Sequence, residues 1–181
     1  MRLRPAEPED IPAIQAIYAH HVLTGLGTFE EVPPSPAEMA ERCAAVVGRG
    51  LPWLVAVEGA EVLGYGYAGP FRTRAAYRFS VEDSVYVAET ARGQGIGRAL
   101  LAALIAECEG MGLRQMVGVI GDSGNAASIA LHKACGFELT AIVPAVGWKF
   151  ERWVDVVWMQ RALGPGAAAA PDGPGIGGMG V

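Results

Sequence analysis

The chain has 181 residues, 51% of them apolar, and a formal net charge of −5 at pH 7. This length fits one domain with a sizeable core, and an acidic chain without a basic tract is not expected to bind nucleic acid. No apolar run reaches the roughly 18 residues that a membrane span needs, so we expect a cytoplasmic protein without a membrane anchor and with a small ligand.

Hydrophobic periodicity and turn residues predict alternating strands and helices along the chain. The expected strands are 3–6, 53–57, 62–68, 81–87, 115–120, 137–143 and 154–160, and the expected helices are 11–23, 36–47, 98–109 and 125–135. Ser35 is expected to cap the second helix, because proline follows it and Glu38 stands at the third helical position.

Residues 81–120 predict a strand, a helix and a second strand parallel to the first, with a ligand loop at the carboxyl end of the first strand. Together with the hairpin expected at 53–68, this predicts a mixed α/β fold, with a central sheet flanked by helices. The folded domain should span 1–163. Residues 164–181 are mainly Gly, Pro and Ala, and we expect a flexible tail there, because such a segment cannot bury enough surface to offset its ordering entropy.

The most informative motif is Arg92-Gly93-Gln94-Gly95-Ile96-Gly97, between strand 81–87 and helix 98–109. Unpaired N–H groups at a helix start, together with the helix dipole, favour an anion, and glycines let the backbone approach it closely. No G-K-[ST] follows, and the spacing is not that of the dinucleotide fingerprint. The motif therefore predicts a phosphate site of another kind.

Several motifs in this order resemble the phosphinothricin acetyltransferase branch of the GCN5-related N-acetyltransferases. The matching segments are 81–87 (VEDSVYV), 92–97, 125–132 (NAASIALH), Gly136-Phe137, 68–71, Arg74, Tyr77, 146–150, Trp153, Asp155 and Trp158. The resemblance covers about residues 1–163. It implies that family's fold, acetyl-coenzyme A as co-substrate, no metal, and transfer to the α-amine of glutamate-like compounds such as phosphinothricin, methionine sulfoximine and methionine sulfone. It also implies a homodimer.

The chemistry needs a base, because an α-amine has a pKa well above 7 and must lose a proton to attack a thioester. The resemblance places the family's catalytic carboxylate at Glu82, acting directly or through a water; the alternative is a solvated strand glutamate. Asp83 points to the opposite face and is not expected to be its partner. The resemblance also implies a proton donor for the departing thiolate at position 132, where many members of the wider superfamily have a tyrosine. His132 is the corresponding candidate here, and a core histidine is the alternative.

The resemblance also implies how acetyl-coenzyme A is held. Strand 81–87 would contact the pantetheine arm through its backbone, and the glycine loop would hold the pyrophosphate. The expected cofactor-binding residues are Val85, Tyr86, Val87, Arg92, Gly93, Gln94, Gly95, Ile96, Gly97, Arg98, Asn125 and Ser128. Asn125 is alternatively a helix N-cap, and Arg92 and Arg98 are alternatively solvated charges.

The acceptor site is less well marked. Arg74 offers a planar fork for a substrate carboxylate, and Phe29 and Tyr77 are expected to pack along the substrate chain. Lys149 is a second cationic candidate, and it alternatively belongs to a dimer interface. A basic surface loop is the alternative for Arg74.

Two other functions remain open from the sequence. One is acetyl transfer to a polyamine, an aminoglycoside or a protein N-terminus, and the other is a non-catalytic acetyl-coenzyme A sensor. A basic, narrow pocket favours amino acids and an acidic one favours polycations, whereas a sensor would not need Glu82. His20 and His21 diverge by about 100° on a helix, so a metal pair is not expected there.

Overall fold

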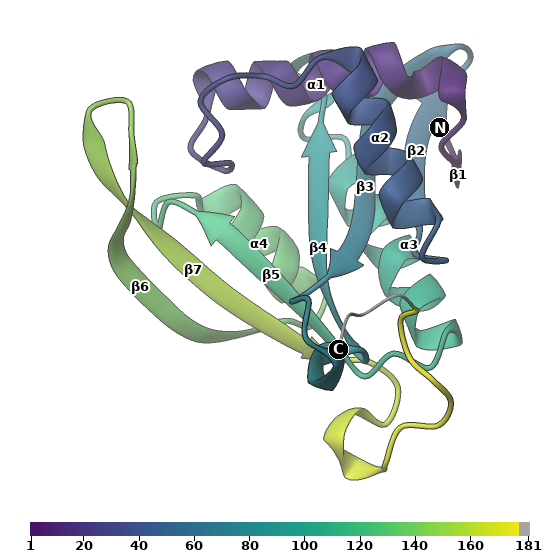
Figure 1. Cartoon of the computed structure of the whole chain (residues 1–181). Coiled ribbons are helices and arrows are strands. Elements are labelled where there is room, and N and C mark those ends of the chain that lie inside the picture. The colour runs from purple at the N-terminus through teal and green to yellow at the C-terminus, as the bar shows by residue number, and fades with distance from the viewer. Residues whose placement is uncertain (178–181) are drawn as a thin grey trace.

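The computed structural model describes residues 1–177 and contains one seven-stranded sheet flanked by helices (Figure 1). The strand order is β1-β2-β3-β4-β5-β7-β6. The strands are β1 (Arg2–Pro5), β2 (Trp53–Glu58), β3 (Glu61–Pro70), β4 (Ser80–Val87), β5 (Gln115–Gly121), β6 (Glu138–Lys149) and β7 (Arg152–Ala162). The helices are α1 (Ile11–Thr24), α2 (Pro36–Val47), α3 (Ile96–Gly110) and α4 (Ala126–Ala134). The predicted mixed α/β fold is confirmed.

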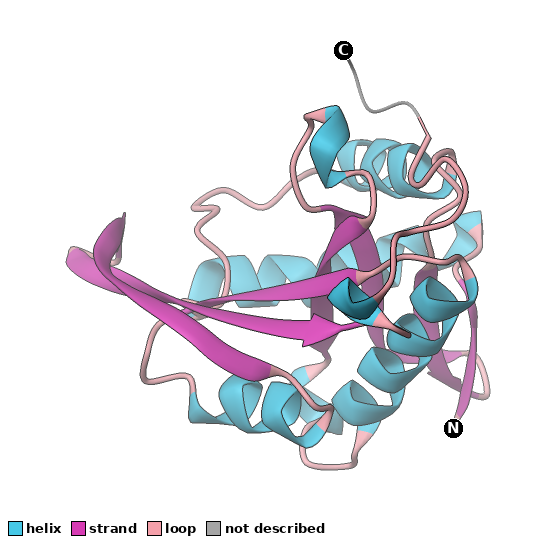
Figure 2. Cartoon of the chain, turned by 90° about the horizontal axis from the view of Figure 1, so that it is seen from below, coloured by secondary structure: helices cyan, strands magenta, loops and turns pink. Residues whose placement is uncertain are grey.

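Sheet pairing follows the connections that the sequence indicates. β2 and β3 form an antiparallel hairpin, whereas β4 and β5 are parallel and are connected through α3. Helices cover both faces of the sheet (Figure 2). α1 and α2 pack on one face, and α3 packs on the other.

The predicted start of α2 is confirmed in atomic detail. The Ser35 hydroxyl accepts a hydrogen bond from the Glu38 N–H at 3.2 Å, and the Glu38 carboxylate accepts one from the Ser35 N–H at 2.6 Å. Both contacts satisfy N–H groups that the first turn leaves unpaired.

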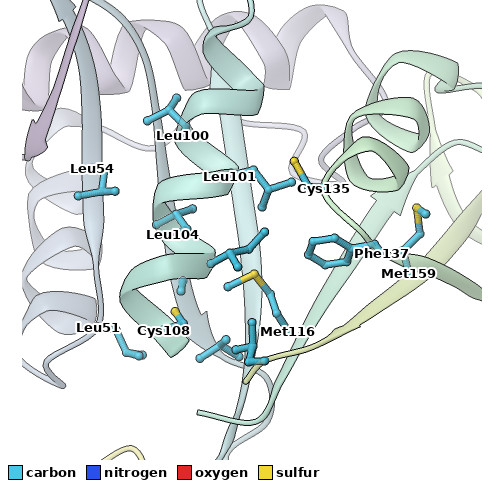
Figure 3. Packing of buried hydrophobic residues seen from close by; sticks show 14 of the residues in the cluster. Leu51, Leu54, Leu100, Leu101, Leu104, Cys108, Met116, Cys135, Phe137 and Met159 are labelled. Atoms are coloured by element: carbon cyan, nitrogen blue, oxygen red, sulfur yellow. The ribbon is translucent and has the colours of Figure 1, made fainter. Parts of the chain in front are cut away.

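The larger core cluster lies between α3 and the sheet. Leu100, Leu101, Leu104 and Cys108 recur at helical spacing on one face of α3, and all four are fully buried. Figure 3 shows them beside residues of the sheet and of the segment that follows α4, including Phe137. This packing fixes α3, and therefore the loop at its N-terminus, against β4.

The last two strands are longer than predicted. β6 extends to Lys149 rather than residue 143, and a tight turn at Phe150 and Glu151, both with positive φ, joins it to β7. Register shifts interrupt the pairing of β6 with β7 at 139–141 and 143–147. These irregularities break the period-2 pattern by which a strand is recognised.

The segment after β7 does not match the flexible tail that the sequence predicts. Ile176 is 4% exposed and belongs to the core cluster, and its N–H donates to the Arg78 carbonyl at 2.7 Å. The Arg114 guanidinium donates to the Ala170 carbonyl at 3.0 Å. Residues 164–177 therefore lie against the domain, while positions 178–181 of the expected tail lie outside the described residues. Within the described chain, no helix has the length and apolar character to cross a bilayer.

Candidate active site

The site lies where β4 and β5 diverge. Their pairing runs from Ser80 and Gln115 to Asp83 and Gly118. Beyond this point β4 stays paired with β3 on one side, and its other edge is unpaired. We call the gap that opens there between β4 and β5 the fork.

The register on β3 decides which backbone groups face the fork. The Ser80 carbonyl accepts from the Phe71 N–H, and the Ala88 N–H donates to the Leu63 carbonyl, so the even-numbered residues of β4 direct their backbone toward β3. The odd-numbered Val85 therefore directs its N–H and C=O into the fork.

The backbones of Val87 and Tyr86 also face opposite sides of β4. The Val87 backbone faces the fork, and its carbonyl accepts a hydrogen bond from His21 Nε2 at 3.0 Å. The Tyr86 backbone faces Tyr65 of β3, and the Tyr86 ring packs against the rings of Tyr18, Tyr65 and His21. The prediction that Tyr86 contacts the pantetheine arm through its backbone does not fit this orientation.

A groove of about 560 Å³ runs from the fork to the glycine loop. The predicted cofactor residues that line it are Val85, Tyr86, Val87, Arg92, Gly93, Gly95, Ile96, Gly97, Arg98, Asn125 and Ser128. Gln94 is not among the lining residues, because its side-chain amide turns to the Thr90 carbonyl at 3.4 Å. His21 and the loop 25–27 also line the groove, and the sequence did not indicate either of them.

The glycine loop has the geometry of an anion site. Gly93 and Gly95 have φ of 75° and 78°, which an L side chain rarely adopts. Gly95 is the N-cap of α3 and supplies no side-chain acceptor, so the first N–H groups of the helix remain available to a ligand. Arg92 forms an ion pair with Glu89 at 2.8 Å, and this pair is at least half exposed on both sides.

Asn125 and Ser128 lie at the start of α4. The Asn125 side chain accepts a hydrogen bond from the Ser128 N–H at 3.2 Å, so Asn125 is the N-cap that the alternative interpretation expects. Both residues also line the groove. The capping role and a contact with ligand are therefore compatible.

His132 forms a buried pair with Asp83, which lies at the fork. His132 Nε2 is 3.1 Å from Asp83 Oδ2, and the two residues are 5% and 6% exposed. Strand alternation correctly predicts that Asp83 points away from Glu82, but that direction leads to His132 on α4. Both residues line the groove, so Asp83 is a site residue that the sequence pattern did not indicate.

Glu82 lies on the other face of β4, and its side chain is 35% exposed. Burial raises the pKa of its carboxyl group above the usual range, and the Arg72 guanidinium, 3.7 Å away, opposes this shift. A glutamate with a raised pKa is better matched to accepting a proton near neutral pH. Glu82 and His132 thus flank β4 from opposite faces.

The predicted acceptor residues are not gathered in one place. Arg74 is exposed at the start of the turn Ala75–Tyr77, and the Tyr77 ring contacts Phe71. The guanidinium beside Glu82 is instead that of Arg72, which lies over the rings of Phe71 and Trp158 at 4.3 and 5.4 Å. Arg72 lies two residues before Arg74 in the same basic loop, and residue spacing alone could not tell which of the two faces Glu82.

Lys149 does not fit the role of substrate ligand. It is 1% exposed, and its ammonium group donates to the carbonyls of Gly25 and Thr28 at 2.9 and 2.8 Å. It anchors the loop that lines the groove and carries Phe29. The Phe29 ring lies against Gly147 of β6, where a Cβ atom would collide with it, and a Cβ atom at Gly121 of β5 would collide with the Leu26 carbonyl of the same loop.

Within the described residues, no group of three or more His, Cys, Asp or Glu side chains is arranged to hold a metal ion. The candidate chemistry therefore rests on Glu82 and His132 as titratable groups, on the unpaired backbone edge of β4 and on the anion site at the start of α3.

Comparison with known proteins identifies the class of this site. Residues 16–137 match the Acetyltransferase (GNAT) family. The chain is 54% identical over 170 residues to a phosphinothricin N-acetyltransferase of Alcaligenes faecalis, which covers 94% of this chain and 86% of the relative. It is 43% identical over 168 residues to an L-methionine sulfoximine/L-methionine sulfone acetyltransferase of Pseudomonas paraeruginosa, covering 92% and 97%.

A solved structure agrees with these matches. A GNAT superfamily phosphinothricin acetyltransferase from Sinorhizobium meliloti, in complex with AcCoA, superposes with a TM-score of 0.93 at 48% identity, covering 96% of this chain and 94% of that one. The backbone edge of β4, the glycine loop and the Asp83–His132 pair line one groove. These matches show that the chain belongs to the GNAT family of acetyltransferases.

Proposed function

We propose that the enzyme transfers the acetyl group of acetyl-coenzyme A to the α-amine of a small amino acid of the phosphinothricin, methionine sulfoximine or methionine sulfone type. The observation that carries this proposal is the open edge of β4, where Val85 and Val87 face a groove that ends at the α3 N-terminus. The names of the similar proteins give the substrate class.

The residues at the fork fit acetyl-coenzyme A. The N–H groups at the start of α3 would bind the pyrophosphate, and the backbone of Val85 and Val87 would bind the amides of the pantetheine arm. The co-substrate supplies a thioester whose carbonyl carbon is attacked by the amine. A Val85 N–H aimed at this carbonyl would stabilise the charge that develops on its oxygen.

Glu82 and His132 divide the proton transfers between the two faces of β4. Glu82 would take a proton from the attacking amine, directly or through a water, and His132 would protonate the departing sulfur. One proton leaves nitrogen and one arrives on sulfur, so the overall reaction is balanced. The raised pKa values of both side chains suit these directions of transfer.

Arg72 is the guanidinium that we assign to the substrate carboxylate, in place of Arg74. Its contact with Phe71 and Trp158 holds the planar group beside Glu82, within reach of an amino acid whose amine faces the base. A cation at this position favours amino acids over polyamines and aminoglycosides.

A homodimer and a cytoplasmic location complete the proposal. The β6–β7 hairpin exposes a run of large apolar side chains, which a second copy of the chain would cover. They are Leu139, Ile142, Val143, Val146, Trp148, Phe150 and Trp153. The three cysteines are free, which fits a reducing compartment.

The test combines cofactor binding with an acceptor screen. Calorimetry should give a binding heat with coenzyme A, and acetyl transfer should be fastest with phosphinothricin, methionine sulfoximine or methionine sulfone. The same assay should include spermidine, an aminoglycoside and a peptide with a free N-terminus. Faster transfer to one of these three amines would assign the enzyme to that substrate class instead. Binding of coenzyme A without transfer to any amine would favour a non-catalytic acetyl-coenzyme A sensor.

A further inference from the structure

Both ring nitrogens of His132 face hydrogen-bond acceptors. Nδ1 lies 2.8 Å from the backbone carbonyl oxygen of Ser128, and Nε2 lies 3.1 Å from Oδ2 of Asp83. The Ser128 hydroxyl is farther from Nδ1, at 3.5 Å. A neutral imidazole has one N–H group and can satisfy only one of the two close contacts. Both are satisfied when His132 is a doubly protonated imidazolium.

The burial of Asp83 strengthens this requirement. Its Oδ1 atom is buried and has no hydrogen-bond partner among the described residues, so the contact with His132 is the one that compensates the carboxylate. A buried carboxylate facing a neutral group would be strongly destabilised. Gly118 of β5 makes room for the pair, because a Cβ there would lie 2.7 Å from the His132 ring.

The groups packed around the pair do not provide a competing charge on the imidazole. Burial raises the pKa of Cys108 to about 12 and raises that of Cys135, so both thiols are neutral at pH 7. Burial alone would lower the pKa of His132, but the hydrogen bond and charge of Asp83 and the Ser128 carbonyl raise it overall. The Phe137 ring packs edge-to-face on His132, with the two ring centroids 5.0 Å apart. Arg98 and Arg161 lower the pKa of Cys135 and are not among the groups that shift the pKa of His132.

We propose that Asp83 is a positioning residue that holds His132 as an imidazolium at the fork end of the groove, where the coenzyme A thiolate departs. The inference rests on the proposed function and deepens it. When the C–S bond breaks, its electron pair goes to sulfur, and the sulfur takes the Nε2 proton, which leaves its hydrogen bond with Asp83. The pair is then a neutral imidazole and a carboxylate, and a proton from solvent restores the imidazolium.

The protonation of His132 can be measured without any substrate. In the protein labelled with ¹⁵N-histidine, two-dimensional NMR at pH 7.5 should show both ring nitrogens of His132 protonated, with its signals identified by their loss in His132→Gln. In Asp83→Asn, which keeps the size of the side chain, one ring nitrogen should lose its proton. The signals of His20 and His21 in the same spectra report whether the variant is folded. A neutral His132 in the unmodified protein, or an unchanged imidazolium in Asp83→Asn, would overturn the proposal.

The pH profile of kcat provides the second readout. An acid must be protonated to act, so kcat should fall as the pH rises through the pKa of His132. In Asp83→Asn this fall should move to lower pH by about 1 unit or more, because an opposite charge has been removed. The KM for acetyl-coenzyme A should stay within about twofold, since the groups assigned to cofactor binding are unchanged. A merely structural Asp83 would lower stability without moving the profile.

A double variant shows whether Asp83 affects kcat through His132 or independently of it. If Asp83 acts through His132, adding Asp83→Asn to His132→Gln should leave kcat nearly unchanged, whereas an independent contribution would lower it further and contradict the proposal. Failure of the proposed function would be recognised separately, as unmodified protein that acetylates none of the amines. The NMR result tests the pair in either case.

Discussion

Replacing Lys149 with Met removes the buried cation that ties loop 25–28 to the sheet. The ammonium group donates to the carbonyls of Gly25 and Thr28, which lie more than 100 residues earlier in the chain. Methionine fills a similar volume but cannot donate, so both carbonyls lose their partner inside the fold. We expect a loss of stability and a looser wall of the groove, which Gly25 helps to line.

The magnitude follows from the two contacts. Each hydrogen bond to a charged donor contributes about 1.5–3 kcal/mol, which gives a gross loss of about 3–6 kcal/mol. Burial lowers the pKa of Lys149, which means that part of this energy is already spent on desolvating the ammonium. We therefore expect a net loss of about 2–4 kcal/mol. For a domain of this size the melting temperature should fall by roughly 4–16 °C.

The assay is thermal unfolding followed by steady-state kinetics, with Lys133→Met as the matched control. Lys133 is the only other lysine of the chain and is exposed on α4. The control should change stability by less than about 0.5 kcal/mol. In Lys149→Met the KM for acetyl-coenzyme A should rise by about threefold to tenfold, because the loop must be ordered again on binding. Equal melting temperatures for the two variants would refute the anchoring role of Lys149.

Three further predictions concern the loop, the hairpin and the base. Gly95→Ala should lower the free energy of unfolding by about 1–2 kcal/mol and weaken coenzyme A binding, because φ is +78° there. The control Gly110→Ala, in open space on α3, should not destabilise the protein; denaturant titration measures the stability of both variants, and calorimetry measures coenzyme A binding. Trp153→Glu should leave a monomer of 18.9 kDa in sedimentation, because Trp153 is 63% exposed on the face assigned to the second copy; a persistent dimer would exclude that face. Glu82→Gln should lower kcat by ~10² or more with unchanged cofactor affinity, and the exposed Glu61→Gln should have no effect; full activity of Glu82→Gln would remove it from the mechanism.

Local signals account for what the sequence predicted correctly. The capping box at Ser35, the glycine loop and the helical spacing of Leu100 and Leu104 each involve residues a few positions apart. Interactions at this range depend on backbone geometry alone, so a sequence pattern is enough to recognise them. The crossover from β4 through α3 to β5 follows from the same local elements and a general rule of connection.

The errors involve contacts between distant parts of the chain. Asp83 and His132 are 49 residues apart, and strand alternation gave the direction of Asp83 without showing what lies there. Lys149 was assigned by its charge, yet its partners are carbonyls of a loop 121 and 124 residues away. Ile176 is a single apolar residue without periodicity, so its burial in the core left no pattern to find.

The open edge at Val85 and Val87 consists of main-chain N–H and C=O groups, which every amino acid except proline possesses. Replacing a side chain elsewhere in the groove leaves these donors and acceptors in place, provided that the strand keeps its register on β3. The half of the site that we assign to the acyl donor is thereby insulated from mutation. Under this assignment, side chains around Arg72 can change to fit a new acceptor while the main-chain contacts to the acyl donor are kept.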